Sequence, residues 1–158
     1  MLDNHSFEMR VTAQTDALYR VSMAMLKNEH DAQDAVHEAI LRAFEKRSQL
    51  RQEQYFGAWL MRILINECKK TLHRRRRYAD IGDALPDIAS RDNPYLSVEL
   101  GEAIDRLPEK LRLTVLLFYV EDYSVKDIGS ILHIPDGTVK SRLNKARTLL
   151  RESLKDTE

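Results

Sequence analysis

The chain of 158 residues has a single cysteine, Cys68, so no disulfide can form within it, and it lacks the Cys and His clusters of a zinc site. Long apolar runs are missing too. The longest, residues 115–120, is far shorter than the roughly 18 residues that a membrane helix needs. The first residues show neither the basic start nor the apolar stretch of a secretory signal. These absences predict a cytoplasmic protein without stable membrane insertion.

Net charge is also missing, because 25 Lys and Arg residues balance 25 Asp and Glu residues. The balance hides strong local excesses. Residues 69–77 contain six bases and no acid, and residues 135–151 contain five bases against Asp136 alone. Between them, residues 78–105 hold seven acids against one base, Arg91. Lys and Arg bind polyanions by releasing counterions from phosphates, so the two basic patches suit nucleic-acid binding, although a single charge run can equally be a solvated helix face.

Strand signals are nearly absent, since β-branched residues are sparse and fall at helical rather than alternating positions. Apolar residues recur at helical spacing in residues 15–27, 31–44 and 56–68, with Asp31 expected to cap the second helix and Phe56 and Trp59 expected in the core. Residues 46–55 lack an apolar period and indicate a polar loop. The sequence therefore predicts an all-α fold of two small helical domains, residues 1–78 and 97–158, joined by a flexible acidic linker, residues 79–96.

The sharpest local pattern predicts two short helices across a tight turn in residues 124–150. Ser124 is expected to cap the first helix, and residues 133–137 contain a proline and a glycine that interrupt the pattern. The second helix has apolar residues spaced by four, three and four, and its other face is basic and hydroxylated. This division suits a helix that reads DNA, although a helical hairpin with a solvated basic face remains the alternative.

Four segments in order resemble the extracytoplasmic-function (ECF) RNA polymerase sigma factors. Residues 136–147 (DGTVKSRLNKAR) resemble the recognition helix of sigma region 4, and residues 107–112 with 122–129 resemble the start of that region. Residues 31–44 (DAQDAVHEAILRAF) resemble the core-binding helix of region 2, and residues 56–66 (FGAWLMRILIN) resemble its promoter-melting helix.

The resemblance implies a non-catalytic subunit that directs core RNA polymerase to promoters. Region 2 would bind the clamp coiled coil of the polymerase and open the −10 element. Region 4 would bind the flap and read the −35 element. A cognate anti-sigma factor is implied as a further partner, whereas no cofactor, metal ion or catalytic residue is expected.

Carried over by motif, the resemblance assigns three sets of residues. The −35 contacts would be made by Thr138, Lys140, Ser141, Arg142, Asn144 and Lys145. The −10 element, with a base flipped out of the duplex, would meet Leu50, Arg51, Gln52, Asn66, Lys69, Lys70, Arg74 and Arg75. The polymerase would meet Asp34, His37, Glu38 and Arg42. Two of these residues depart from the family pattern: His37 stands where glutamine is common, and Leu50 replaces a more usual aromatic residue.

Two other functions compete with this interpretation. A helix-turn-helix regulator that never joins polymerase would explain residues 135–151 but would give no role to residues 31–44. A carboxylate-bridged di-iron enzyme could use Asp34, His37 and Glu38, but such sites need two Glu-x-x-His copies and further carboxylates. The chain offers one imperfect copy and lacks a glycine-rich phosphate loop.

Overall fold

The computed structural model describes residues 2–80 and 97–155. All of the regular elements in these two ranges are helices, so the expected all-α fold is confirmed. The chain divides into two compact units, residues 1–89 and 90–158. Most of the predicted acidic linker, residues 81–96, lies outside the described residues. Within the ranges that the structure describes, no helix is both long and apolar enough to cross a membrane.

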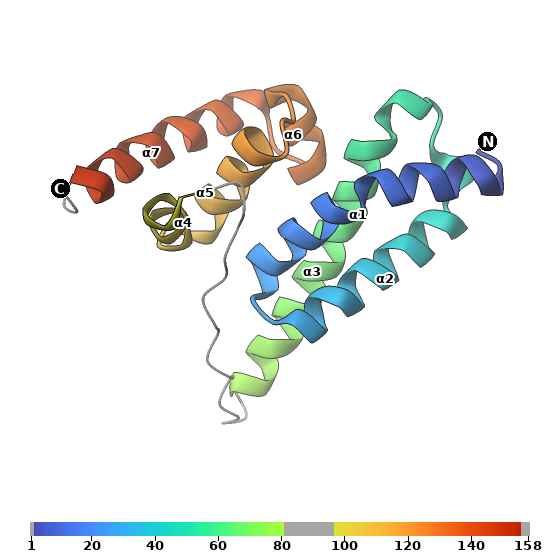
Figure 1. Cartoon of the computed structure of the whole chain (residues 1–158), viewed down its shortest axis with the longest axis horizontal. Helices are drawn as coiled ribbons and strands as arrows, with labels where there is room; N and C mark the ends of the chain where they lie inside the picture. Colours follow the sequence, from blue (N-terminus) through green and yellow to red (C-terminus); the bar gives the residue numbers. More distant parts are fainter. Residues whose placement is uncertain (1, 81–96, 156–158) are drawn as a thin grey trace. The chain divides into compact units, whose positions relative to one another are not determined.

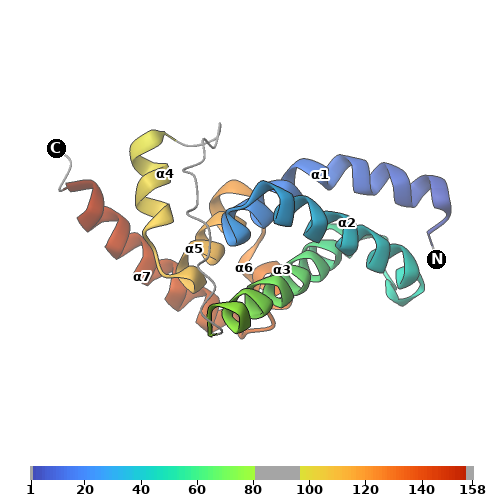
Figure 2. The same cartoon turned by 90° about the horizontal axis from the view of Figure 1, so that it is seen from below.

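The first unit consists of three long helices that pack against one another (Figures 1 and 2). They are α1 (Asn4–Leu26), α2 (Glu29–Glu45) and α3 (Phe56–Asp80). Two single 3₁₀ turns, η1 (Arg47–Gln49) and η2 (Glu53–Tyr55), lie in the connection between α2 and α3. The predicted polar loop therefore has local helical structure at each of its ends.

An alanine face on α2 lets the three helices of the first unit approach closely. Four of the five buried residues of α2 are alanines, Ala32, Ala35, Ala39 and Ala43, spaced by three, four and four. Because alanine projects only a methyl group, larger side chains from the neighbouring helices fill the remaining volume. Those that are fully buried include Leu18, Val21 and Leu26 of α1 and Leu60, Met61, Leu64 and Ile65 of α3.

Two boundaries in the first unit differ from the prediction. The first helix begins at Asn4, capped by Asp3, and not near residue 15. Its early turns were missed because their apolar residues, at positions 7, 9, 11 and 13, alternate along the sequence and show no helical period. The predicted cap of α2 was also wrong: the side chain of Asn28 accepts a hydrogen bond of 2.8 Å from the backbone N–H of Asp31. The carboxylate of Asp31 is thereby left available for a tertiary contact.

The second unit is built around one long helix, α7 (Asp136–Lys155), which packs against the three shorter helices α4, α5 and α6. These are α4 (Val98–Asp105), α5 (Glu109–Val115) and α6 (Val125–Leu132). The apolar run of the sequence forms the end of α5 and a π-helical turn, η3 (Leu116–Val120). The fully buried side chains Leu117, Ile128 and Leu143 come from η3, α6 and α7 and anchor the core of this unit.

The turn between α6 and α7 depends on a glycine that no larger residue can replace without movement. Ser124 caps α6 as predicted, accepting a hydrogen bond of 3.0 Å from the N–H of Asp127. In the middle of α6, a Cβ on Gly129 would lie 2.9 Å from the carbonyl oxygen of Ile134 and 2.9 Å from Oδ1 of Asp136. The missing side chain therefore lets the start of α7 come close against α6.

The single cysteine is buried in the core of the first unit. Sγ of Cys68 lies 3.7 Å from Oγ of Ser22, whose hydroxyl donates to the carbonyl oxygen of Ala32 at 3.0 Å. Burial raises the pKa of the Cys68 thiol from its ordinary 9.0 to about 11. Because thiols react as thiolates, this site is expected to be inert in the folded protein.

We expect alkylation of Cys68 by iodoacetamide at pH 8 to be at least about 100-fold slower in the folded than in the denatured chain, because a pKa two units higher lowers the thiolate fraction about 100-fold. As pH rises, the unfolded chain loses the thiol proton first. The stability that this pKa shift contributes is therefore full below pH 9 and is lost toward pH 11. Mass spectrometry gives the rates, and a Cys68→Ala variant with an equally steep loss of stability between pH 9 and 11 would contradict the linkage.

Candidate nucleic-acid interface

Helix α7 presents one apolar face to its own unit and one polar face to solvent. Val139, Leu143 and Ala146 are buried. All six residues predicted to contact the −35 element lie at the surface. Lys140, Ser141, Asn144 and Lys145 are exposed, and Thr138 and Arg142 are half-buried. With 20 residues, α7 is about 30 Å long. The major groove of B-DNA admits an α-helix, so the polar face of α7 is available for base and phosphate contacts.

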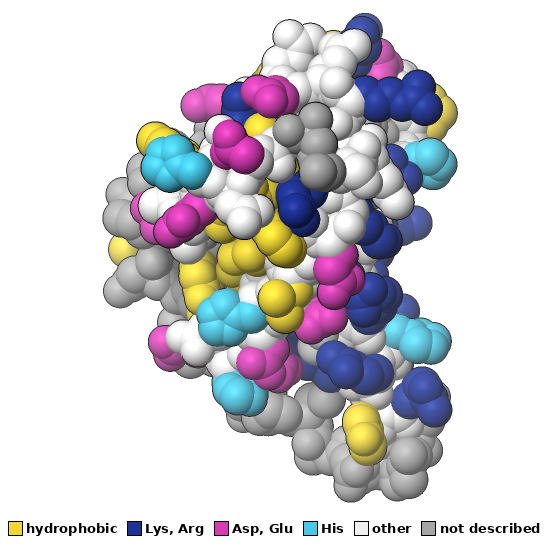
Figure 3. Space-filling view, turned by 90° about the vertical axis from the view of Figure 1, so that its right-hand side faces the viewer, with side chains coloured by type: hydrophobic (Ala, Val, Ile, Leu, Met, Phe, Trp, Pro, Cys, Tyr) yellow, Lys and Arg dark blue, Asp and Glu magenta, His cyan; other side chains and the backbone are white. Residues whose placement is uncertain are grey.

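Helix α3 carries the second basic surface. Asn66, Lys69, Lys70 and Arg74 are all exposed. Residues 66, 70 and 74 are each four apart, so their side chains share one face of the helix. Figure 3 shows Lys and Arg side chains following one another down one edge of the molecule. Exposed cations in a row suit a phosphate backbone, which presents its charges at regular intervals.

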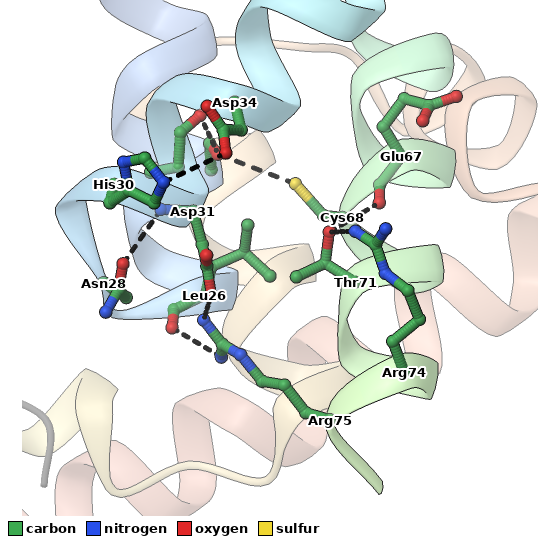
Figure 4. A network of polar contacts seen from close by, with 12 residues as sticks. Leu26, Asn28, His30, Asp31, Asp34, Glu67, Cys68, Thr71, Arg74 and Arg75 are labelled. Carbon is green, nitrogen blue, oxygen red and sulfur yellow. Dashed lines mark hydrogen bonds and ion pairs between the residues drawn. The ribbon is translucent and has the colours of Figure 1, made fainter. Parts of the chain in front are cut away.

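Arg75 differs from its neighbours, because its guanidinium forms hydrogen bonds with α1 and α2 of the same unit (Figure 4). Nη1 donates to the carbonyl oxygen of Leu26 at 2.7 Å, at the end of α1. Nη2 lies 2.5 Å from Oδ2 of Asp31, and only 20% of the arginine side chain is exposed. Arg75 thus ties the ends of α1 and α2 to α3. The prediction that it contacts DNA takes no support from this geometry, and we leave Arg75 out of the proposed DNA surface.

Arg74 and Arg75 provide a matched pair for separating folding from DNA binding. We expect Arg75→Ala to lower the free energy of unfolding of the first unit by about 1–3 kcal/mol, because charge-assisted bonds to partly buried groups are lost. Arg74→Ala removes an exposed cation that donates a hydrogen bond of 3.2 Å to Thr71, within its own helix, and it should change stability by less than about 0.5 kcal/mol. Urea denaturation followed by circular dichroism measures both, and equal effects would contradict this assignment.

Helix α1 holds the second half of the loop between α2 and α3, and also the start of α3. Nη2 of Arg10 lies 3.0 Å from Oε2 of Glu53, and Nε2 of Gln14 donates to the carbonyl oxygen of Gly57 at 2.7 Å. Of the loop residues predicted to meet the −10 element, Leu50 is half-buried and both Arg51 and Gln52 are exposed. The anchoring on α1 therefore fixes a loop whose tip remains accessible to a ligand.

Aromatic rings pack next to both ends of this loop. Phe56, at the start of α3, is buried as predicted, and its ring lies 5.8 Å from that of Phe7 and 5.9 Å from that of Trp59. Trp59 itself is half-buried, so it is not the full core residue that the sequence indicated. Arg47 stacks over the ring of Phe44, 3.9 Å from its centroid. These contacts give the loop a rigid base.

The outer face of α2 carries the residues predicted to bind polymerase. Asp34 and His37 are exposed, and Asp34 lies 3.4 Å from Nε2 of His30. Glu38 and Arg42 form an ion pair of 3.4 Å one turn further along the helix. Between them, Leu41 is 59% exposed. Single exposed apolar residues are common at protein surfaces, so Leu41 is of interest only because it lies among the predicted polymerase contacts; it was not predicted from the sequence.

A groove of about 840 Å³ between α2 and α3 brings two of the predicted sets together. Its lining includes all four predicted polymerase contacts, Asp34, His37, Glu38 and Arg42, and three predicted DNA contacts, Lys69, Lys70 and Arg74. Leu50, Arg51, Gln52, Asn66 and Arg75 are not part of this lining. The two surfaces predicted for polymerase and for DNA therefore adjoin each other on one side of the first unit.

Glu67 links these two surfaces and was not among the residues predicted from the sequence. Its Oε1 lies 2.6 Å from Nε of Arg42 and 3.1 Å from Nζ of Lys70, while its side chain is only 9% exposed. A signal was present, since Glu67 is the only acid between residues 56 and 77 of a basic helix. An isolated acid in such a stretch indicates an internal partner for its cations.

Comparison with known proteins decides the family. Residues 11–78 match Sigma-70 region 2, and residues 97–150 match Sigma-70, region 4. The chain is 30% identical to the ECF RNA polymerase sigma factor SigW of Bacillus subtilis (strain 168), over 98% of this chain and 91% of that protein. This chain belongs to the ECF RNA polymerase sigma factors. As a sigma factor, it directs the promoter-specific initiation of transcription.

Further relatives agree with this membership. The ECF RNA polymerase sigma-E factor of Escherichia coli (strain K12) is 34% identical, over 74% of this chain and 70% of that protein. Among solved structures, the sigma factor RpoE from Bartonella quintana, crystallised with the anti-sigma factor NepR, superposes with a TM-score of 0.82 and 25% identity, over 94% of this chain and 96% of that one. Neither a polymerase-independent regulator nor a di-iron enzyme explains matches to both sigma regions in order.

Proposed function

We propose that this sigma factor divides promoter recognition between its two units, with the first binding the −10 element and the clamp of polymerase and the second binding the −35 element and the flap. The observation that carries the proposal is the split character of α7, whose inner residues are buried and whose outer residues are basic and exposed. A face that is only solvated can carry charges of either sign, whereas residues 137–151 carry five bases and no acid, which suits phosphates.

The polymerase contact is assigned to the outer face of α2. Asp34, Glu38 and Arg42 offer charges of both signs, and Leu41 offers an exposed apolar side chain between them. Interfaces of this kind combine a small apolar centre with a charged rim, and the rim charges mainly set orientation and association rate. The clamp coiled coil is the partner that the position of this helix in the family implies.

The −10 contact is assigned to α3 and the loop that precedes it. Lys69 and Arg74 are exposed for phosphate contacts, and Asn66 offers both a donor and an acceptor to a base edge. The anchored loop with Arg51 and Gln52 supplies further polar groups at an accessible tip. Opening DNA costs stacking energy, which a fixed receiving site for an extruded base partly restores.

The −35 contact is assigned to the outer face of α7. Arg142 and Lys145 suit guanine edges or phosphates, and a bidentate Arg–guanine pair discriminates between bases by about 1–3 kcal/mol. Each unit carries few such cations, so its separate affinity for DNA should be modest and strongly salt-dependent. Docking both units on one polymerase would raise the effective concentration of the second contact once the first has formed.

An anti-sigma factor is the proposed regulatory partner. The Bartonella quintana relative was crystallised with its anti-sigma factor, which supports a similar partner for this chain. The exposed Leu41 and the adjoining groove between α2 and α3 give such a partner a surface that polymerase would also need. Competition for this surface would silence the sigma factor without any chemical change in it.

Run-off transcription with purified core polymerase and a genomic DNA library tests the proposal. We expect new start sites to appear only when the sigma factor is added, and to share one upstream pair of elements. Scrambling either element should abolish the transcript. The control is core polymerase with a chain carrying Lys110→Ala, an exposed lysine outside the proposed surfaces, which should keep the same start sites. Start sites unchanged by the wild-type protein would overturn the proposal.

A further inference from the structure

A tyrosine of the second unit reaches the DNA-facing side of α7 from another helix. The hydroxyl of Tyr119 accepts a hydrogen bond of 2.6 Å from Nε of Arg147, and the guanidinium lies 5.7 Å from the centre of the tyrosine ring. Nη1 of Arg147 in turn donates to Oδ1 of Asn144 at 2.9 Å. A chain of three polar side chains therefore ends on Asn144, one of the residues assigned to the −35 element.

The π-helical turn explains how Tyr119 comes to be available. Within η3 (Leu116–Val120), Leu116 and Leu117 are buried, whereas Tyr119 is 50% exposed. The N–H of Glu121 donates to the carbonyl oxygen of Leu116 at 3.0 Å, the i→i+5 bond of a π turn. Such turns are rare and occur frequently at functional sites, because the wider turn changes the direction of the side chains it carries.

The hydrogen bond from Arg147 fixes the orientation of the Asn144 amide. Arginine can only donate hydrogen bonds, so the amide atom that faces Arg147 must be the oxygen. The NH₂ group of Asn144 then points away from Arg147 and is the part of the amide left for another partner. A free asparagine on an exposed helix face would instead offer its donor and its acceptor in either order.

We propose that Tyr119 is a positioning residue which, through Arg147, makes Asn144 a hydrogen-bond donor toward the −35 element. In the major groove, guanine presents acceptors at N7 and O6 and thymine presents O4, whereas cytosine presents a donor and adenine presents a donor beside its N7. On the strand that Asn144 faces, guanine and thymine present acceptors alone. The amino group of adenine or cytosine would meet the NH₂ of Asn144 and be left without a partner, so this residue favours guanine or thymine on that strand. This inference rests on the proposed role of α7 in reading the −35 element.

The role assigned to Tyr119 is separable from a role in folding. Its ring is half exposed, and removing only the hydroxyl leaves the ring and its packing in place. Without the hydroxyl, Arg147 loses one partner and its contact with Asn144 is no longer fixed. The amide of Asn144 could then also turn its oxygen toward a base that presents a donor. Discrimination between bases at this position should therefore fall, while phosphate contacts elsewhere persist.

The test is run-off transcription by holoenzyme on a promoter library in which every −35 position is randomised, with the transcribed templates sequenced. Asn144→Ala identifies the position that this residue reads. We expect wild-type protein to prefer guanine or thymine there and Tyr119→Phe to weaken that preference about threefold to tenfold, the size of one hydrogen bond. Preferences at the other positions and the melting temperature should not change. Tyr78→Phe, which removes a hydroxyl from an exposed tyrosine of the first unit, serves as the matched control.

Three outcomes would overturn the inference. They are a wild-type preference for adenine or cytosine at that position, an unchanged profile for Tyr119→Phe, and an equal loss of preference at every position. In each case, −35-dependent transcription by the wild-type holoenzyme would still support the proposed function. A wild-type holoenzyme that ignores the −35 sequence would instead refute the role of α7 and the inference with it.

Discussion

Replacing Gly129 by alanine is expected to lower the free energy of unfolding of the second unit by about 1–3 kcal/mol and to reduce −35-dependent transcription at least about tenfold. A Cβ at this position would lie 2.9 Å from the carbonyl oxygen of Ile134, which is backbone and cannot rotate away. It would lie equally close to Asp136, the first residue of α7. Relief of the clash must therefore move α6, the turn at Ile134 or the start of α7, and such a movement would displace the base contacts proposed for α7.

Gly101 supplies the matched control for this substitution. It lies in α4, and a Cβ there meets nothing within 4 Å. Alanine is the better helix former, so Gly101→Ala should raise stability by about 0.5–1 kcal/mol and leave transcription unchanged. Thermal unfolding and run-off transcription compare the two variants. A rise in melting temperature for Gly129→Ala equal to that for Gly101→Ala would show that the turn tolerates a side chain.

The double variant Lys69→Ala with Arg74→Ala is expected to weaken promoter binding by holoenzyme at least about tenfold and to flatten its salt dependence. Each phosphate contact contributes about 0.9 to the slope of log K against log salt concentration. Loss of two contacts should therefore reduce the slope by about 1.8. Lys70 is kept in this variant because it pairs with the buried Glu67, and its loss would mix folding with binding.

A second double variant, Lys110→Ala with Lys155→Ala, changes the net charge of the protein by the same amount at two exposed lysines, one on α5 and one at the last residue of α7, that belong to none of the proposed sets of contacts. It should leave both the affinity and the salt slope nearly unchanged. Filter binding or fluorescence anisotropy at several KCl concentrations gives the slopes. Equal slopes for the two variants would mean that α3 contributes general charge and no defined phosphate contacts.

Structure that depends on residues close together in the sequence was predictable. The period of apolar residues indicated the helices, the proline and glycine of residues 133–137 indicated the turn, and Ser124 was correctly assigned as the cap of α6. Even this local information had limits. The apolar residues in the early turns of α1 alternate along the sequence and show no helical period, and Asn28 was overlooked as a cap beside Asp31.

Which cations remain free for a partner was not predictable. Arg74 and Arg75 are adjacent in a run of four arginines, yet one is exposed and the other holds Leu26 and Asp31, more than 40 residues earlier in the chain. Their different roles follow from the angle of about 100° between successive side chains of a helix, combined with the position of α3 against α1 and α2. Glu67 likewise contacts Arg42 because α3 packs against α2.

The helical class of this sigma factor and the polar face of α7 were predictable from the sequence, because they follow from residue spacing along a single helix. The order of its segments was predictable from their resemblance to the family. The three-dimensional arrangement was needed to show that Arg75 stabilises the fold, that Glu67 joins two surfaces, and that Tyr119 contacts Arg147 and through it a residue 25 positions away. Such contacts depend on how helices are packed, since packing brings together side chains whose separation along the chain carries no signal.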